Sequence, residues 1–201
     1  FWVRGVATSA TAVPAEVDGL VVDLLLFGFA LSLAFGISAR LLPIFLGIEV
    51  VSVGPLLAIF VALFVGTSLR VVGDVSGQGL ATALGAVCLG LACAGFPICS
   101  RVPFGRRRDR RSADPPALVQ TSRAPNLLIR SAYGWLVLGG LALVVDGVAR
   151  LVGASFVPPE DGWRHVLTAG YLTLLIMGTG ARLLPGFARM PPRPSRRLLV
   201  V

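Results

Sequence analysis

Five long apolar stretches restrict the fold of this chain more than any other feature. They cover approximately residues 19–39, 50–70, 79–100, 131–152 and 164–183. About 20 apolar residues in a helix are enough to cross the roughly 30 Å hydrocarbon core of a bilayer. Each stretch is expected to be helical, because a backbone group without a hydrogen bond is costly in lipid. With 55% hydrophobic and 14% charged residues, the sequence predicts an all-α polytopic integral membrane helix bundle, a single membrane domain over residues 1–201.

A segment near the end of the chain repeats a segment near its start. Residues 165–187 align without gaps on residues 23–45, which lie 142 positions earlier, and 10 of the 23 aligned positions are identical. The identical positions are Leu25/Leu167, Gly28/Gly170, Leu33/Leu175, Gly36/Gly178, the run Ala-Arg-Leu-Leu-Pro at 39–43 and 181–185, and Phe45/Phe187. A similarity of this kind indicates an internal structural repeat.

The repeat also predicts how the spans are organised. The first and fifth stretches have three others between them, so both cross the membrane in the same direction. The repeating unit is therefore four helices in parallel register, unlike the inverted repeats of many secondary transporters. In this register a sixth span would begin near residue 192, and we expect the chain to be part of a longer protein.

Arginine supplies the whole basic excess of the chain, whose formal net charge is +8. Eight arginines lie in the polar segment 101–130, among them Arg106, Arg107 and Arg108. If this segment is cytoplasmic, 14 arginines lie on the inner side of the membrane and 4 on the outer side. The sequence thus predicts a multi-pass protein of a bacterial-type cytoplasmic membrane, with loop 101–130 inside. Because the arginines lie at the ends of apolar spans, the expected partners are anionic lipid headgroups and not nucleic acid.

Each copy of the repeat ends in the run Ala-Arg-Leu-Leu-Pro. Arg40 and Arg182 could bind an anion, since arginine suits carboxylates and phosphates. Both lie at the C-terminal ends of the predicted spans, where a cation complements the helix dipole and reaches the membrane interface, so a structural role is favoured. We expect Pro43 and Pro185 to end their helices.

Three ionisable residues within or near the spans are candidates for a polar or ligand site. Asp23 occupies the position in the first copy that His165, the single histidine, occupies in the second. An ionisable group in a span is costly and is often functional, but Asp23 is expected near the water interface. Asp146 lies deeper, and Arg150 four residues later is its predicted partner on the same helix face. A neutral imidazole at His165 could ligate haem iron or copper, or could simply anchor the chain at the interface.

Small residues recur at intervals of four in two spans, which favours close helix packing. The pattern comprises Gly28, Ser32 and Gly36 in the first span and Ala86, Gly90 and Ala94 in the third. Glycines of the fourth span, among them Gly139 and Gly140, are expected to act in the same way.

The run H165-x4-G170-x7-G178-x2-A181-R182-x2-P185 resembles the recurring helix signature of NnrS-type membrane proteins and of the catalytic subunits of haem-copper oxidases. That resemblance implies repeated four-helix arcs, and it implies that His165 is a ligand of haem b or copper. It further implies electron transport as the process in which the protein takes part.

Two functions follow as alternatives. The first is an integral membrane subunit associated with an electron-transfer complex, respiratory or photosynthetic, that binds haem or copper. The second is a cofactor-free accessory subunit that stabilises a larger membrane complex through contacts with other membrane subunits. A transporter ranks third, because the spans show no clear break and no polar residues at the midplane. No self-contained catalytic constellation is recognisable, which argues against an enzyme.

Overall fold

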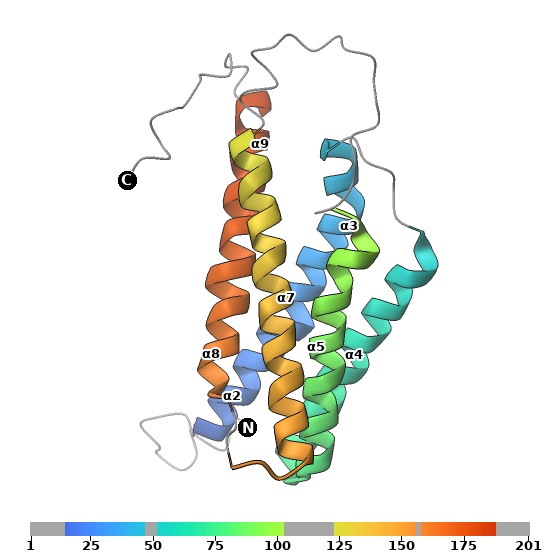
Figure 1. Ribbon diagram of the computed structural model, residues 1–201, viewed down its shortest axis with the longest axis vertical. Coiled ribbons are helices and arrows are strands. Elements are labelled where there is room, and N and C mark those ends of the chain that lie inside the picture. The colour runs from blue at the N-terminus through green and yellow to red at the C-terminus, as the bar shows by residue number, and fades with distance from the viewer. Residues whose placement is uncertain (1–14, 47–51, 103–122, 156–157, 188–201) are drawn as a thin grey trace, which may run out of the picture.

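The computed structural model describes residues 15–46, 52–102, 123–155 and 158–187 (Figure 1). Throughout these ranges the regular structure is helical, without a strand. Five helices are long and apolar enough to cross a membrane, and they run up and down side by side. Large apolar side chains are exposed along all of them, as expected of surfaces that face lipid. The prediction of an all-α polytopic bundle is confirmed, and the chain is a multi-pass membrane protein.

The bundle is built from three uninterrupted α-helical spans and two spans that contain a π-helical segment. The first span comprises α2 (Ala15–Asp23), η1 (Leu24–Leu31) and α3 (Ser32–Leu46). The next three spans are α4 (Val53–Ser76), α5 (Gly79–Ser100) and α7 (Arg123–Leu151). The last span comprises α8 (Glu160–His165), η2 (Val166–Leu172) and α9 (Thr173–Phe187).

Several helix ends differ from those predicted. The second span continues to Ser76, six residues past its predicted end, and α7 begins at Arg123, inside the segment predicted as loop 101–130. The expectation that Pro43 and Pro185 end their helices is wrong, since α3 reaches Leu46 and α9 reaches Phe187. A proline removes only one backbone donor, and membrane helices tolerate it because their surroundings satisfy the freed carbonyl.

The internal repeat is visible in the backbone itself. The π-helical segments η1 and η2 begin at Leu24 and Val166, which are equivalent positions of the two copies. Just after each π-helical turn, a hydroxyl group donates a hydrogen bond to a carbonyl five residues earlier. Ser32 Oγ lies 2.9 Å from the oxygen of Phe27, and Thr173 Oγ1 lies 3.1 Å from that of Thr168. A π-helical turn is rare, so its occurrence at the same point of both copies supports their common origin.

Glycine permits the closest helix contacts, which lie between α5 and its two neighbours. A Cβ atom on Gly90 would lie 2.5 Å from the carbonyl oxygen of Gly140, and one on Gly140 would lie 2.7 Å from that of Gly90. On the other side of α5, a Cβ on Gly85 would lie 2.7 Å from the backbone nitrogen of Arg70 in α4. Small residues let membrane helices approach in this way. They hold α4, α5 and α7 together as a layer.

Aromatic rings fill the centre of the bundle and join four spans. Phe35 of α3 stacks on Phe96 of α5 with ring centroids 3.9 Å apart, and Phe96 lies 6.1 Å from Tyr133 of α7. Tyr171 of η2 meets both Phe35 and Tyr133 edge-on. Such pairs each contribute about 0.5–1.5 kcal/mol beyond the burial of their area. The cluster therefore fixes the first and last spans against the central layer.

Candidate functional site: a buried ion-pair network

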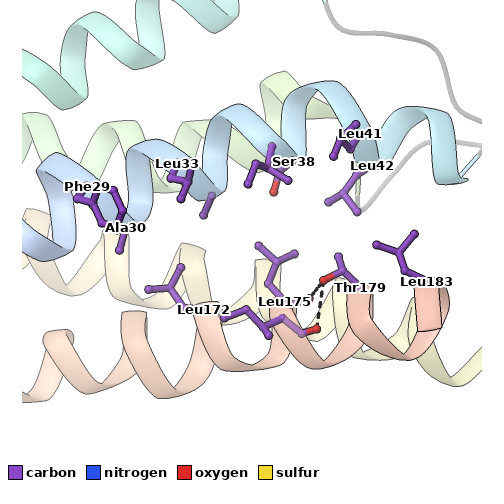
Figure 2. A pocket seen from close by; sticks show the side chains of 13 residues that line it. Phe29, Ala30, Leu33, Ser38, Leu41, Leu42, Leu172, Leu175, Thr179 and Leu183 are labelled. Carbon is purple, nitrogen blue, oxygen red and sulfur yellow. Dashed lines mark hydrogen bonds between the residues drawn. The ribbon is translucent and has the colours of Figure 1, made fainter. Parts of the chain in front are cut away.

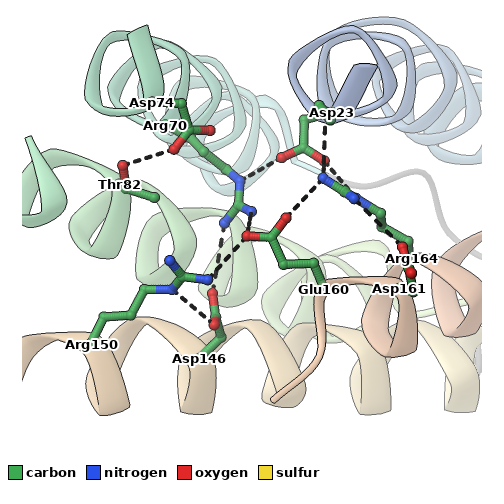
Figure 3. Close-up of polar contacts among 10 residues, drawn as sticks. Asp23, Arg70, Asp74, Thr82, Asp146, Arg150, Glu160, Asp161 and Arg164 are labelled. Carbon is green, nitrogen blue, oxygen red and sulfur yellow. Dashed lines mark hydrogen bonds and ion pairs between the residues drawn. The ribbon is translucent and has the colours of Figure 1, made fainter. Parts of the chain in front are cut away.

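Charged side chains from four spans converge at the end of the bundle where the α4–α5 turn and α8 lie (Figures 1 and 3). We refer to them as the charge network. Its members are Asp23, Arg70, Asp146, Arg150, Glu160, Asp161 and Arg164.

Arg70 of α4 is the centre of the charge network. Its side chain is only 2% exposed, and three carboxylates surround it. Arg70 Nε donates to Asp23 Oδ2 at 2.6 Å, and Nη2 donates to Glu160 Oε1 at 3.1 Å. Nη1 lies 3.7 Å from Asp146 Oδ2, which makes an ion pair without a hydrogen bond. A single guanidinium thus links the first, second and fourth spans to the start of the fifth.

Two further arginines complete the network at its rim. Arg150 Nε donates to Asp146 Oδ1 at 3.0 Å, and its Nη2 donates to Glu160 Oε1 at 3.0 Å. Arg164 Nε donates to Asp23 Oδ1 at 3.0 Å, and its Nη2 lies 3.1 Å from Glu160 Oε2. Asp23 and Asp146 each contact two arginines and Glu160 contacts three, so no carboxylate at the centre lacks a counter-charge. Three arginines and three carboxylates form an electrically balanced core.

Trp163 closes the network on the side of the apolar core. Its ring is 1% exposed and packs against Phe27 with ring centroids 5.6 Å apart. The guanidinium carbons of Arg70 and Arg164 lie 5.0 Å and 5.1 Å from the centre of the same ring. Cation–π contacts of this kind gain strength where water is excluded. The indole ring thus lies between the charged side chains and the apolar core of the bundle.

Local structure explains how the charges reach one another. The glycine at position 85 lets the backbone of α4 at Arg70 approach α5 closely, which directs the guanidinium into the bundle. Asp146 and Arg150 lie one turn apart on α7 and share a face. Glu160 opens α8, where a carboxylate also complements the helix dipole.

The predicted candidates have different positions in the structure. The pairing of Asp146 with Arg150 is present, and Asp146 also faces Arg70. Asp23, expected near water, is 3% exposed and pairs with two arginines. His165, its equivalent in the repeat, is exposed and lies outside the network, with Nδ1 2.7 Å from the carbonyl oxygen of Asp161.

The predicted topology arginines lie away from the network. Arg40 is exposed near the opposite end of the first span. Arg182 Nη1 donates to Asn126 Oδ1 at 2.7 Å and so links α9 to the start of α7. Arg106, Arg107 and Arg108 lie outside the described residues.

Sequence reasoning missed Arg70, Glu160 and Arg164 as members of one site. The predicted spans end at Arg70 and begin at Arg164, and Glu160 lies between two of them, so the span pattern alone places all three at the membrane interface. One signal was available: Arg70 is followed by Val71 and Val72, so the apolar helix continues past it. A charge placed one and a half turns inside a helix needs a partner from another span.

A second feature of the bundle is apolar. A groove of about 330 Å³ runs between α3 and α9, and nearly all of its lining is aliphatic (Figure 2). Ser38 lies on it, and its Oγ makes no hydrogen bond to the described residues; the same holds for the hydroxyls of Tyr133 and Tyr171 in the adjoining core. The lining of this groove fits a hydrocarbon chain, with two small polar side chains, Ser38 and Thr179, on its wall.

Within the described ranges, no group of three or more His, Cys, Asp or Glu side chains could hold a metal ion.

The fold and the charge network define a class: a multi-pass membrane protein whose buried charges are paired with one another across its spans. Comparisons with known protein families, with curated proteins and with solved structures find no match for this chain. The resemblance to NnrS-type proteins and haem-copper oxidases therefore stays a prediction.

We predict that Arg70→Met destabilises the protein by about 3–5 kcal/mol, because it leaves buried carboxylates without their counter-charge. Unfolding of the purified protein in detergent, followed by circular dichroism, measures the loss. Adding Asp23→Asn to this variant should recover part of the stability, since one stranded charge is removed. Asp161→Asn is the control: that side chain is 83% exposed, so its change should stay within about 0.5 kcal/mol. If Arg70→Met lost less stability than the control variant Asp161→Asn, the central role of Arg70 would be contradicted.

Proposed function

We propose that this protein is an accessory membrane subunit that stabilises a larger membrane complex, in the setting of respiratory or photosynthetic electron transfer. The observation that carries the proposal is the charge network, in which Arg70 joins three other spans through paired carboxylates. Transport or catalysis needs polar groups that are free to meet a substrate. Here the charged groups at the centre are engaged with one another, and this favours a rigid frame.

The apolar features support the same proposal. The groove between α3 and α9 is lined by aliphatic side chains, which offer packing contacts and little polar recognition. Large apolar residues remain exposed on every span and are available to lipid or to other membrane helices. This surface is therefore suited to packing against other membrane helices and not to catalysis. The electron-transfer setting rests on the resemblance of the repeat signature alone.

Deletion of the chain tests the proposed function. Solubilised membranes of the source cell are separated by native electrophoresis, with and without the chain. We expect a large complex that contains the chain in the wild type and a smaller or less abundant complex in the deletion strain. Re-expression of the wild-type chain should restore it. If the chain migrates alone, and if no complex changes on its deletion, the proposal fails.

A second candidate function is supported by the geometry of His165. The carbonyl oxygen of Asp161 lies 2.7 Å from Nδ1, which favours a proton on Nδ1 and leaves the lone pair on Nε2. Metal-bound histidines commonly have their other ring nitrogen oriented by such a carbonyl. His165 is exposed, so a second ligand for haem b or copper could come from a neighbouring subunit.

An absorption spectrum of the dithionite-reduced complex distinguishes the two candidates. Ligation of haem b by His165 predicts a b-type band that is lost in His165→Ala and unchanged in the network-rim variant Asp161→Asn. If the ligand is copper, the copper content of the same samples is measured in place of the absorption band. An identical spectrum and metal content in wild type and His165→Ala would leave the accessory function alone.

We also propose that the protein lies in a bacterial-type cytoplasmic membrane with segment 101–130 in the cytoplasm. The arginine distribution supports this orientation. The acidic side chains of the charge network also support it, since they gather at the α8 end of the bundle (Figure 3), whereas Arg40 and Arg182 lie toward the other ends of their spans. The basic ends would then contact anionic headgroups.

Labelling of single cysteines tests this orientation, after Cys88, Cys93 and Cys99 are replaced by alanine. In intact spheroplasts an impermeant maleimide should react with a cysteine at position 161 and spare one at position 112. After lysis both should react. The reverse pattern would place segment 101–130 outside.

A further inference from the structure

The two copies of the repeat present opposite faces to the bundle. In the first copy Phe27, Leu31 and Phe35 are completely buried in the core. Their equivalents in the second copy, Ala169, Thr173 and Met177, are exposed. Each copy therefore has one buried face and one exposed face. The positions that are buried in the first copy are exposed in the second.

In the second copy, the opposite face of the helix packs against α7. Leu167 is completely buried and Leu175 is 7% exposed. A Cβ atom on Gly170 would lie 2.8 Å from the ring of Trp135 in α7, and one on Gly178 would lie 2.8 Å from the side chain of Ile129. Leu167, Gly170 and Gly178 thus form the surface of η2 and α9 that packs on α7, and Leu175 lies beside them on the wall of the groove.

The same four residue types are present in the first copy, where no described helix packs directly on them. Leu33 lies on the wall of the groove toward α9, and Gly28 lies on a hollow toward α4. Leu25 is 58% exposed and Leu33 is 51% exposed. A Cβ atom on Gly28 or Gly36 would meet nothing within 4 Å. We call these four residues the first-copy face. They are identical to residues whose role in the second copy is helix packing.

We propose that the first-copy face binds a transmembrane helix of a partner subunit in the way that the second copy binds α7. This inference deepens the proposed accessory function and rests on it, since that function supplies the partner subunit. The second copy argues for a helix as the occupant, because its equivalent glycines, Gly170 and Gly178, face Trp135 and Ile129 of α7. A glycine that faces a helix allows close approach.

The chemistry of the partner helix follows from α7. Since α7 and the last span are consecutive and run in opposite directions, the partner helix should run antiparallel to the first span (Figure 1). It should place bulky side chains, as Trp135 and Ile129 do, over the two glycines. It should also have a small residue opposite Leu25, as Gly139 lies against Leu167, where a Cβ would come within 2.6 Å of that leucine.

A second copy of this chain is a poor occupant. The matching surface of α7 is already covered by η2 and α9 of its own bundle. A second copy could offer it only by releasing its last span.

The test uses a paired substitution in the full chain. Gly28→Leu combined with Gly36→Leu fills the first-copy face, and Gly134→Leu combined with Gly180→Leu makes the same change at two other helical glycines with nothing within 4 Å. Both variants should unfold at the temperature of the wild type when purified alone in detergent. In native membranes the first variant should lower recovery of the chain in its complex about tenfold or more, and the control should not. Equal recovery for the two variants would overturn the proposal.

A photocrosslinker in place of Leu25, which is 58% exposed, identifies the occupant without filling the glycine positions, so it decides the question even if the paired variant misfolds. The expected product is a peptide from a transmembrane helix of another subunit, antiparallel to the first span and with the bulky and small pattern described above. The same probe at Leu141, exposed on α7, is the control. Crosslinks to lipid only, or to a second copy of the chain, would overturn the proposal. If deletion of the chain disrupts a complex but these tests fail, the accessory function stands without this docking face.

Discussion

The burial of one arginine is the constraint on which the rest of this bundle depends. Removal of an ion from water carries a penalty of several kcal/mol even after relaxation, so Arg70 is tolerated only where counter-charges meet it. Asp23, Asp146 and Glu160 come from three other parts of the chain, and each must be held at the right height and rotation. The charge network therefore specifies how the spans are arranged at this end. The glycine contacts between α4, α5 and α7 and the aromatic cluster give the bundle the rigidity that this pairing requires.

The internal repeat shows how one sequence pattern serves two environments. The first copy presents its phenylalanine face to the core, and the second presents its leucine and glycine face to α7. Identical residues are thus buried in one copy and exposed in the other. The alignment equates Asp23 with His165, yet Asp23 is enclosed by arginines and His165 is exposed. The π-helical turn is a local property and is present in both copies. The surroundings differ because different neighbouring spans supply them.

Much of the fold could be predicted because its causes are local. A helix in lipid satisfies its own backbone, so the apolar stretches became spans, and the pairing of Asp146 with Arg150 followed from a spacing of four on one helix. The ends of the helices were harder to predict from the sequence, as Pro43 illustrates, because α3 continues past it. The close approach of Gly90 and Gly140 agrees with the small-residue pattern of the sequence. Gly28 and Gly36 were expected to pack in the same manner, but a Cβ atom on either would meet no described atom within 4 Å.

The sequence by itself determined that this protein is an all-α membrane bundle of five spans with a parallel repeat. Length and hydropathy are sufficient for that conclusion, because the bilayer leaves few ways to satisfy a backbone. Only the tertiary structure decided which charged residues of different spans meet. Arg70 finds its partners 47 and 90 positions away, and Arg164 pairs with a residue 141 positions earlier. Such contacts depend on how each helix is rotated about its axis and on which helices are neighbours. Packing between spans sets both, and no local pattern contains them.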